Sequence, residues 1–176
     1  MAFHEKGFHG VGMDELGTRA GLSGPSLYRY FSGKDEILAT LLDEAMDELL
    51  GATAKVEDDP VRDLRRALRH HVDFALANRP LITLYQREVR SLVDPWAKRF
   101  TRRRAQYTRS WEALVGRAHP ALDATAVAAT TQGCLGLVFS VAGWPDRALA
   151  TPDVAGLILD LVTRGLDGVD GAGSAA

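Results

Sequence analysis

Apolar residues along the chain recur at three- and four-residue intervals, and short clusters containing glycine or proline interrupt the pattern. The interruptions fall at residues 10–12, 21–24, 32–33, 58–60, 79–80, 94–95, 119–120, 144–145 and 151–152. Between them the spacing predicts helices of about 8 to 22 residues, and no segment alternates apolar and polar positions long enough to predict a strand. Several prolines stand where a helix would begin, the position at which the missing N–H costs least. The pattern therefore predicts an all-α, helix-rich fold.

The stretch GLSGPSLYRYFSGKDEIL, residues 21–38, has the residue order of a helix-turn-helix. A helix over residues 13–20 would end at Gly21, which tolerates the left-handed backbone of a helix C-terminus. Leu22 is expected to fill the angle between the two helices, and Ser23 is a good N-cap for the second one.

The second helix is expected over residues 24–30, and Ser32 is expected to cap the helix that follows it. Asp35 stands three residues after Ser32, where the acid of a capping box would be. A short helix with polar groups at its N-terminal end, set across a turn from another helix, can enter a DNA major groove. Tyrosine hydroxyls and a lysine near a helix start can bond to phosphates. The alternative is a helical hairpin with incidental surface tyrosines.

The segment VGMDELGTRAGLSGPSLYRYFSGKDEIL is similar to the signature of TetR-family transcriptional regulators, and the similarity extends over residues 5–42. It implies a DNA-binding regulator, most often a repressor that a small molecule releases from its operator, acting as a homodimer. Carried over by position, Tyr28, Tyr30 and Lys34 would contact phosphates. Pro25, Ser26 and Arg29 would lie on or beside the reading helix. The expected DNA-binding residues are then Gly24, Pro25, Ser26, Tyr28, Arg29, Tyr30 and Lys34.

The sequence departs from the family pattern in three places. Gly12 stands where a capping Ser or Thr is usual, and Gly24 has no side chain at a position that often reads a base. The basic arm and first helix of the family would precede the residues FHEKG, so the first helix is expected to be incomplete. The expected organisation is a helix-turn-helix domain over residues 1–50 and a ligand-binding and dimerisation domain over residues 51–168. Residues 169–176 are expected to be a disordered tail.

Three polar residues fall on apolar faces of the predicted helices of the larger domain: His71, Glu88 and Arg103. A lone buried charge is costly, so each needs a partner. One interpretation is a structural Glu88–Arg103 ion pair that braces two helices. The other is the polar end of an aromatic-lined pocket, with Arg103 or His71 available to an anionic ligand group.

The candidate ligand pocket combines these polar residues with the aromatic face of two predicted helices. Its residues are His71, Tyr85, Glu88, Trp96, Phe100, Arg103, Tyr107 and Trp111. The segment LYQREVRSL, residues 84–92, is also similar to a segment of actinobacterial TetR-family members that sense acyl-coenzyme A thioesters. An acyl-CoA or another lipid-like anion is therefore the expected effector.

The segment from residue 121 to 144 is apolar nearly all round, and residues 154–166 carry a second apolar stripe. A helix without a polar face is buried on both sides. A chain this small has few helices to cover it, so a second copy is expected to do so; the alternative is an ordinary core helix. The expected dimer interface comprises Val127, Thr131, Cys134, Leu135, Val138, Val154, Leu157, Ile158 and Leu161.

Composition excludes several other classes. The single cysteine forms no internal disulfide and suits a reducing cytoplasm, and the five histidines lack metal-ligand spacing, so no metal is expected. No apolar run of about 18 residues predicts a membrane span. The chain has no nucleophile elbow or phosphate-binding glycine loop, so neither an enzyme nor a cofactor is expected. The competing class is an all-α small-molecule-binding or interaction protein that does not bind DNA.

Overall fold

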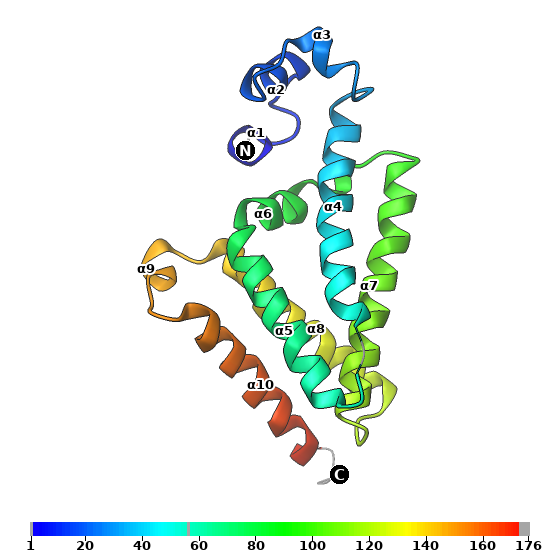
Figure 1. Cartoon of the computed structure of the whole chain (residues 1–176), viewed down its shortest axis with the longest axis vertical. Helices are drawn as coiled ribbons and strands as arrows, with labels where there is room; N and C mark the ends of the chain where they lie inside the picture. Colours follow the sequence, from blue (N-terminus) through cyan, green and yellow to red (C-terminus); the bar gives the residue numbers. More distant parts are fainter. Residues whose placement is uncertain (1, 56, 173–176) are drawn as a thin grey trace. The chain divides into compact units, whose positions relative to one another are not determined.

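The computed structural model describes residues 2–55 and 57–172, which form helices and their connections with no strand among them (Figure 1). The prediction of an all-α fold is confirmed. The helices are α1 (Ala2–Lys6), α2 (Met13–Arg19), α3 (Gly24–Leu27), α4 (Lys34–Ala54), α5 (Pro60–Ala77), α6 (Arg79–Glu88), η1 (Val89–Ser91), α7 (Trp96–Ala118), α8 (Ala124–Ser140), η2 (Val141–Gly143), α9 (Asp146–Leu149) and α10 (Val154–Ala172).

The chain divides into two compact units. Unit 1 contains the residues up to Asp47 together with Pro80–Arg104, and unit 2 contains Glu48–Arg79 and the residues from Ala105 onwards. This division differs from the expected boundary at residue 50, because α6 and the first part of α7 group with the N-terminal helices. The expected disordered tail is replaced at residues 169–172 by the end of α10, and residues 173–176 lie outside the described residues.

The turn between α2 and α3 forms as its residue types predict. Gly21 adopts a φ of +69°, and the Ser23 hydroxyl oxygen accepts a 3.2 Å hydrogen bond from the amide of Ser26. However, α3 ends at Leu27 and not at Tyr30. The amides of Arg29 and Tyr30 bond to carbonyls three residues earlier, at 3.2 and 3.0 Å, so the chain continues as tight turns.

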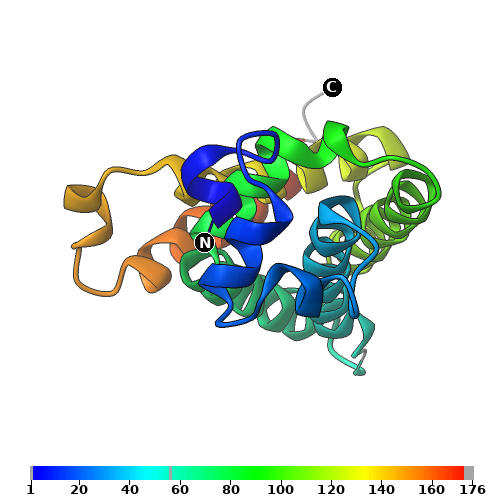
Figure 2. The same ribbon diagram turned by 90° about the horizontal axis from the view of Figure 1, so that it is seen from above.

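Helices α2 and α3 pack against each other (Figure 2). They approach each other closely at Gly17. A Cβ added to Gly17 would lie 3.2 Å from the Gly24 nitrogen and 3.2 Å from the Leu22 carbonyl oxygen. The Leu22 amide also bonds to the Gly17 carbonyl at 2.9 Å. The Leu22 side chain is 40% exposed, so it is not the buried residue between the two helices that the sequence pattern predicts. The sequence pattern alone does not single out Gly17.

At the start of α4, the expected capping box is replaced by two hydrogen bonds that Ser32 donates to a different acid from the expected one. The Glu36 carboxylate accepts hydrogen bonds from the Ser32 amide at 2.6 Å and from its hydroxyl at 2.7 Å. These bonds lower the pKa of Glu36. The capping-box pattern predicts Asp35 in this role, but α4 begins at Lys34, so the residue one position further along reaches Ser32.

The helical phase of α6 also differs from the prediction. The spacing predicts one helix over residues 80–92 with Tyr85 and Glu88 on its apolar face, whereas α6 ends at Glu88 and η1 follows. The side chains of Ile82 and Leu84 are the buried ones in α6. Tyr85 is half-buried, because the face of α6 that packs inward is the one that carries Ile82 and Leu84.

In unit 2, helices α5, α8 and α10 pack against one another (Figures 1 and 2). Asp59 and Asp123 cap α5 and α8 by accepting bonds from backbone amides three residues later, at 3.0 and 2.8 Å. Residues 124–143 are long and apolar enough to cross a bilayer, contrary to the expectation, yet only 28% of this stretch is buried. One such helix is weak evidence for a membrane span, because a core helix of a soluble protein can have the same length and composition.

Candidate nucleic-acid interface and buried polar cluster

The segment that follows α3 presents two tyrosines and an arginine to solvent. Tyr28 is 57% exposed and Tyr30 is 68% exposed, and Arg29 between them is also exposed. Large aromatic side chains this exposed stabilise no core. Their hydroxyls, next to a guanidinium, form a surface suited to phosphate oxygens.

The N-terminal residues of α3 divide between structural and exposed positions. Pro25 is exposed, whereas Ser26 is half-buried and its hydroxyl lies 2.8 Å from that of Ser23. A Cβ at Gly24 would lie 2.0 Å from the Asp14 carboxylate, so the missing side chain allows α2 and α3 to pack closely. These features leave Pro25 as the most accessible N-terminal side chain of α3.

Lys34 is half-buried and is already engaged within the chain. Its ammonium donates to the Phe8 carbonyl at 3.0 Å and to the Val11 carbonyl at 3.4 Å, and it lies 4.6 Å from the centre of the Phe8 ring. An ammonium has three protons, so a further bond to a phosphate remains compatible with these contacts. Lys34 therefore fixes the α1–α2 connection, and its contact with a phosphate stays a prediction.

Glu88 holds the same connection through the backbone amide. Its Oε1 accepts a 3.1 Å hydrogen bond from the Phe8 amide, and its Oε2 accepts one of 3.2 Å from the Ser91 hydroxyl. Gly7 beside it has a φ of +73°, and a Cβ there would lie 3.4 Å from Oε1. We call the contacts of Phe8 with Lys34 and Glu88 the loop clasp.

Arg103 pairs with α4, so the predicted Glu88–Arg103 ion pair is wrong. Its guanidinium lies 3.2 Å from the Asp43 carboxylate and also contacts Asp47, and Arg99 contacts Asp43 at 3.0 Å. The acids are four residues apart on α4 and the arginines four apart on α7, so two helix faces match. This matched spacing is the sequence signal that could have identified the pairing.

His71 lies in an aromatic cluster of unit 2 formed by α5, α7 and α8. Its Nε2 lies 2.9 Å from the Tyr107 hydroxyl, and its ring centre lies 5.2 Å from that of Trp111 and 4.8 Å from that of Phe139. We call His71, Tyr107, Trp111 and Phe139 the buried polar cluster. Burial lowers the pKa of His71 to about 3, and the neighbouring His70 contributes to the shift. His71 is therefore neutral at physiological pH and does not offer the predicted cation to an anionic ligand.

The remaining residues of the predicted ligand pocket belong to unit 1. The rings of Tyr85 and Phe100 lie 5.8 Å apart, and Trp96 is half-buried at the start of α7. Sequence reasoning brought His71, Tyr107 and Trp111 together correctly. It missed Phe139, because that residue belongs to a helix expected to face a partner.

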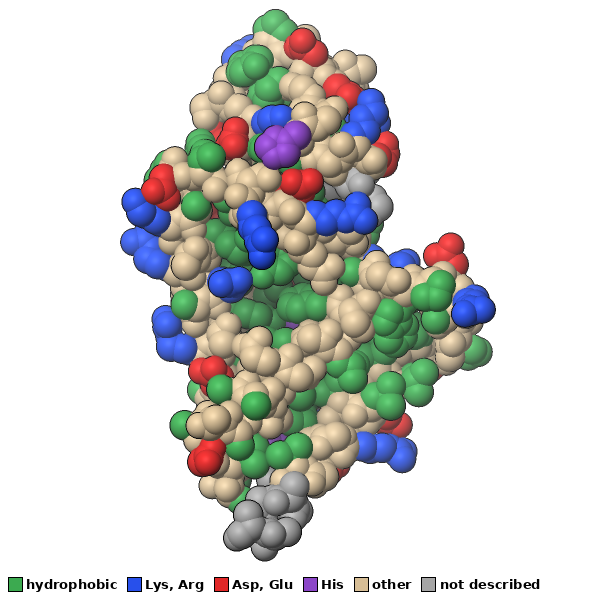
Figure 3. Space-filling view, turned by 180° about the vertical axis from the view of Figure 1, so that it is seen from behind, with side chains coloured by type: hydrophobic (Ala, Val, Ile, Leu, Met, Phe, Trp, Pro, Cys, Tyr) green, Lys and Arg blue, Asp and Glu red, His purple; other side chains and the backbone are tan. Residues whose placement is uncertain are grey.

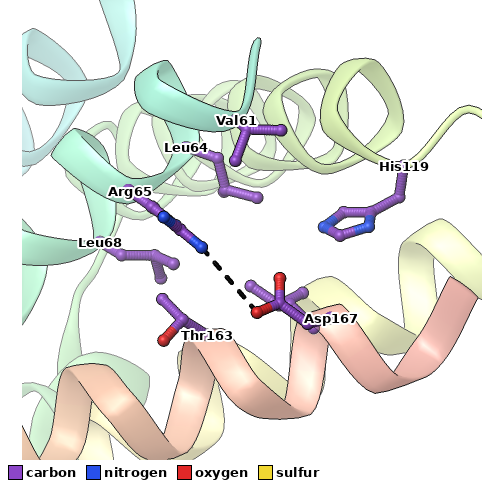
Figure 4. A pocket seen from close by; sticks show the side chains of 8 residues that line it. Val61, Leu64, Arg65, Leu68, His119, Thr163 and Asp167 are labelled. Carbon is purple, nitrogen blue, oxygen red and sulfur yellow. Dashed lines mark ion pairs between the residues drawn. The ribbon is translucent and has the colours of Figure 1, made fainter.

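A small pocket lies between α5 and α10, beside the ion pair of Arg65 and Asp167 at 3.8 Å (Figure 4). Its space is about 10 Å³, and Val61, Leu64 and His119 also line it. That volume is about what one water needs, so an organic effector does not fit there.

The face formed by α8 and α10 is apolar and partly uncovered. Leu157 is 47% exposed and Leu161 is 52% exposed, and a groove of about 250 Å³ runs between the two helices. Hydrophobic side chains also gather on the surface in Figure 3. Cys134 and Gly133 line this groove, and burial raises the pKa of the Cys134 thiol to about 11.

Part of the predicted dimer interface is core of the single chain. The side chains buried within the chain are those of Thr131, Leu135, Val138 and Ile158. They lie on the faces of α8 and α10 that pack inside unit 2, so they have no surface to offer a partner. The half-buried or exposed residues of the prediction are Val127, Cys134, Val154, Leu157 and Leu161.

Two family models match the chain. Residues 1–41 match "Bacterial regulatory proteins, tetR family", and residues 57–166 match "Tetracyclin repressor-like, C-terminal domain". Together they cover both the helix-turn-helix and most of the larger helical region.

Individual relatives agree with these matches. The chain is 36% identical over 75 residues to the HTH-type transcriptional activator FasR of Mycolicibacterium smegmatis, a match that spans 41% of this chain and 34% of FasR. The TetR-family regulator PfmR of Thermus thermophilus superposes with a TM-score of 0.77 at 25% identity, covering 93% of each chain. AibR, solved in complex with isovaleryl coenzyme A and operator DNA, superposes with a TM-score of 0.76 at 18% identity, covering 92% of this chain and 90% of AibR.

The first prediction concerns the loop clasp. Replacing Glu88 with Ala removes the acceptor of the hydrogen bond from the Phe8 amide. The protection of that amide against hydrogen exchange should fall by about 1–3 kcal/mol, the cost of an unsatisfied donor. Amide exchange followed by NMR measures this at Phe8 directly. Glu88→Gln retains an acceptor and should lose less, and Gln86→Ala on the exposed side of α6 is the matched control. Equal Phe8 exchange in all variants would contradict the contact.

The second prediction concerns His71 and pH. Its folded pKa of about 3 lies below the unfolded value near 6.5, so the unfolded chain binds an extra proton between these values. Stability should therefore fall as pH falls below about 6.5, by about 2 kcal/mol between pH 7 and pH 5 from this group alone. Urea unfolding at both pH values should show a smaller loss for His71→Gln than for the wild type. His9→Gln replaces an exposed histidine of unit 1, leaves His70 and His71 in place, and should keep the wild-type loss. A His71 variant with that same loss would refute the prediction.

Proposed function

Since the chain belongs to the TetR family of bacterial regulatory proteins, we propose that it is a ligand-responsive repressor that binds operator DNA as a homodimer. The observation that carries this proposal is the exposed Tyr28–Arg29–Tyr30 surface, which follows a capped helix-turn-helix within residues 1–41. TetR-family regulators bind DNA and are not enzymes, and they act in the cytoplasm. The competing class, a helical binding protein without DNA, leaves this exposed surface without a role.

The reading segment supports DNA binding mainly through the phosphate backbone. Tyr28 and Tyr30 offer neutral donors, Arg29 offers a charged one, and Lys34 retains a proton beyond its two carbonyl contacts. Base reading falls to Pro25, Ser26 and neighbouring positions of α3, because Gly24 has no side chain. In a two-fold dimer, two such segments would reach successive major grooves about 34–36 Å apart.

We propose an acyl-CoA or a related lipid-like compound as the effector. The resemblance of residues 84–92 to acyl-CoA-sensing members supports this class, and AibR was solved with isovaleryl coenzyme A. The proposed mechanism is a population shift, in which the effector favours a dimer state whose reading segments no longer match the groove spacing. FasR is named an activator, so the repressor assignment is the part that the operator experiment must test.

The third prediction tests DNA binding. Genomic fragments that the purified chain enriches provide the operator, and fluorescence anisotropy gives its affinity. Tyr28→Phe should lower the affinity for operator DNA about threefold to tenfold, as expected for the loss of one hydrogen bond. The loss should be equal for all fragments, because phosphates carry no base identity.

Ser110→Ala is the control for this measurement, because the Ser110 hydroxyl bonds to the Gln106 carbonyl of its own helix. A changed sequence preference in Tyr28→Phe would refute the phosphate role. Enrichment of no specific fragment would refute the proposed function. Transcription of a reporter from the enriched operator then distinguishes repression from activation.

The fourth prediction tests the homodimer. Leu161 is 52% exposed beside the α8–α10 groove, so Leu161→Glu should place a charge in the proposed interface and produce monomers at micromolar concentration. Val93→Glu replaces another side chain that is 50% exposed, in unit 1, and should leave the dimer intact. Light scattering after size exclusion measures both. A wild-type monomer, or a Leu161→Glu dimer as stable as the wild type, would contradict this interface.

A further inference from the structure

The N-terminal end of α3 offers few polar side-chain groups of its own. In a helix-turn-helix, the N-terminal residues of the second helix contact base edges in the major groove. In this chain those residues are Gly24, which has no side chain, Pro25, whose side chain has no polar atom, and Ser26. Ser26 is half-buried, and its hydroxyl shares a 2.8 Å hydrogen bond with that of Ser23. The end of α3 that would face the bases therefore has little of its own with which to read them.

A carboxylate from α2 occupies the space beside Gly24. A Cβ on Gly24 would lie 2.0 Å from Oδ1 of Asp14 and 3.2 Å from its Cγ, so the carboxylate stands where the side chain of residue 24 would begin. Asp14 is exposed, and no hydrogen bond or ion pair within the described part of the chain engages its carboxylate. Glu15, next to it, is paired with Lys6 at 2.7 Å and with Arg19 at 3.2 Å. Asp14 is thus an acid of α2 that remains available at the start of α3.

A carboxylate can only accept hydrogen bonds, and this limits which base it can read. In the major groove, guanine presents two acceptors and thymine presents one, so both oppose a carboxylate. Adenine presents an amino donor beside its N7 acceptor, whereas cytosine presents its N4 amino group alone. Phosphate oxygens are negative and repel the same group. The carboxylate of Asp14 therefore favours cytosine over the other bases and over the DNA backbone.

We propose that Asp14 is a specificity-determining residue, which accepts a hydrogen bond from the N4 amino group of one cytosine in each half of the operator. This inference rests on the proposed binding of operator DNA and specifies one base that the chain selects. Gly24 belongs to the same arrangement, because a residue without a Cβ leaves space for the carboxylate at the start of α3. The phosphate contacts proposed for Tyr28 and Tyr30 contribute affinity and carry no base identity.

Selection from a random double-stranded DNA library with the full chain measures the base preference at every position of the bound site. The wild type should select a motif with a cytosine in each half, and Asp14→Ala should accept all four bases at that position. The affinity for cytosine relative to the other bases should fall there about threefold to tenfold, as expected for the loss of one hydrogen bond. Asp14→Asn should move the preference towards adenine, because an amide both donates and accepts and can pair with N7 and N6.

Two further variants locate the effect. Gly24→Ala keeps the carboxylate but places a methyl group where it stands, so it should relax the preference at the same position. Glu44→Gln removes the charge of an exposed acid on α4 and should leave the motif unchanged, which separates a base contact from a general loss of negative charge. Thermal melting of each variant confirms that the fold is retained.

The outcomes distinguish this inference from the proposed function. If the wild type selects a motif and both Asp14 variants select the same motif, the role of Asp14 is overturned and the DNA-binding function stands. A change of motif that Glu44→Gln reproduces overturns the role of Asp14 as well. If the wild type selects no motif, the proposed function itself fails, and the inference that rests on it fails with it.

Discussion

The ion pairs of Arg103 with Asp43 and Asp47 join α4 and α7 within unit 1 and satisfy the charges between them. Arg103 is 16% exposed in its side chain and Asp43 is 15% exposed, so both charges need close partners. Glu88, another inward-facing charge of unit 1, is held separately by the amide of Phe8 and the hydroxyl of Ser91. In unit 2, burial keeps His71 neutral.

The sequence predicted local structure correctly wherever a few neighbouring residues decide the backbone conformation. Gly21 and Ser23 form the turn and cap that their residue types predict, since both act on adjacent backbone. The sequence did not predict which residues distant along the chain form ion pairs or hydrogen bonds with each other. Helical projection correctly placed Glu88 and Arg103 inward, but a projection gives a direction and no neighbour. The pairing came from α4, whose acidic sequence is typical of a solvated face.

The same limit explains the α8 and α10 results. Composition correctly identified two apolar helices. The sequence of α8 is apolar on every side, however, so it does not indicate which side of the helix faces the core. Packing within unit 2 buries Thr131, Leu135 and Val138 and leaves Cys134 along the groove. On α10, Ile158 and Val162 occupy the inner face, so Leu157 and Leu161 remain exposed. Burial within the chain has to be known before an interface can be assigned.

The loop clasp has a consequence for how this protein can diverge among its relatives. Glu88 bonds to a main-chain N–H, and every residue except proline supplies that group. Lys34 likewise bonds to main-chain carbonyls, which all residues possess. Substitutions that keep the backbone conformation of the α1–α2 connection therefore retain these hydrogen bonds, which excludes Gly7 with its φ of +73°. The polar contacts of the clasp are tolerant of sequence drift in the loop, whereas Glu88 and Lys34 themselves are not interchangeable with most side chains.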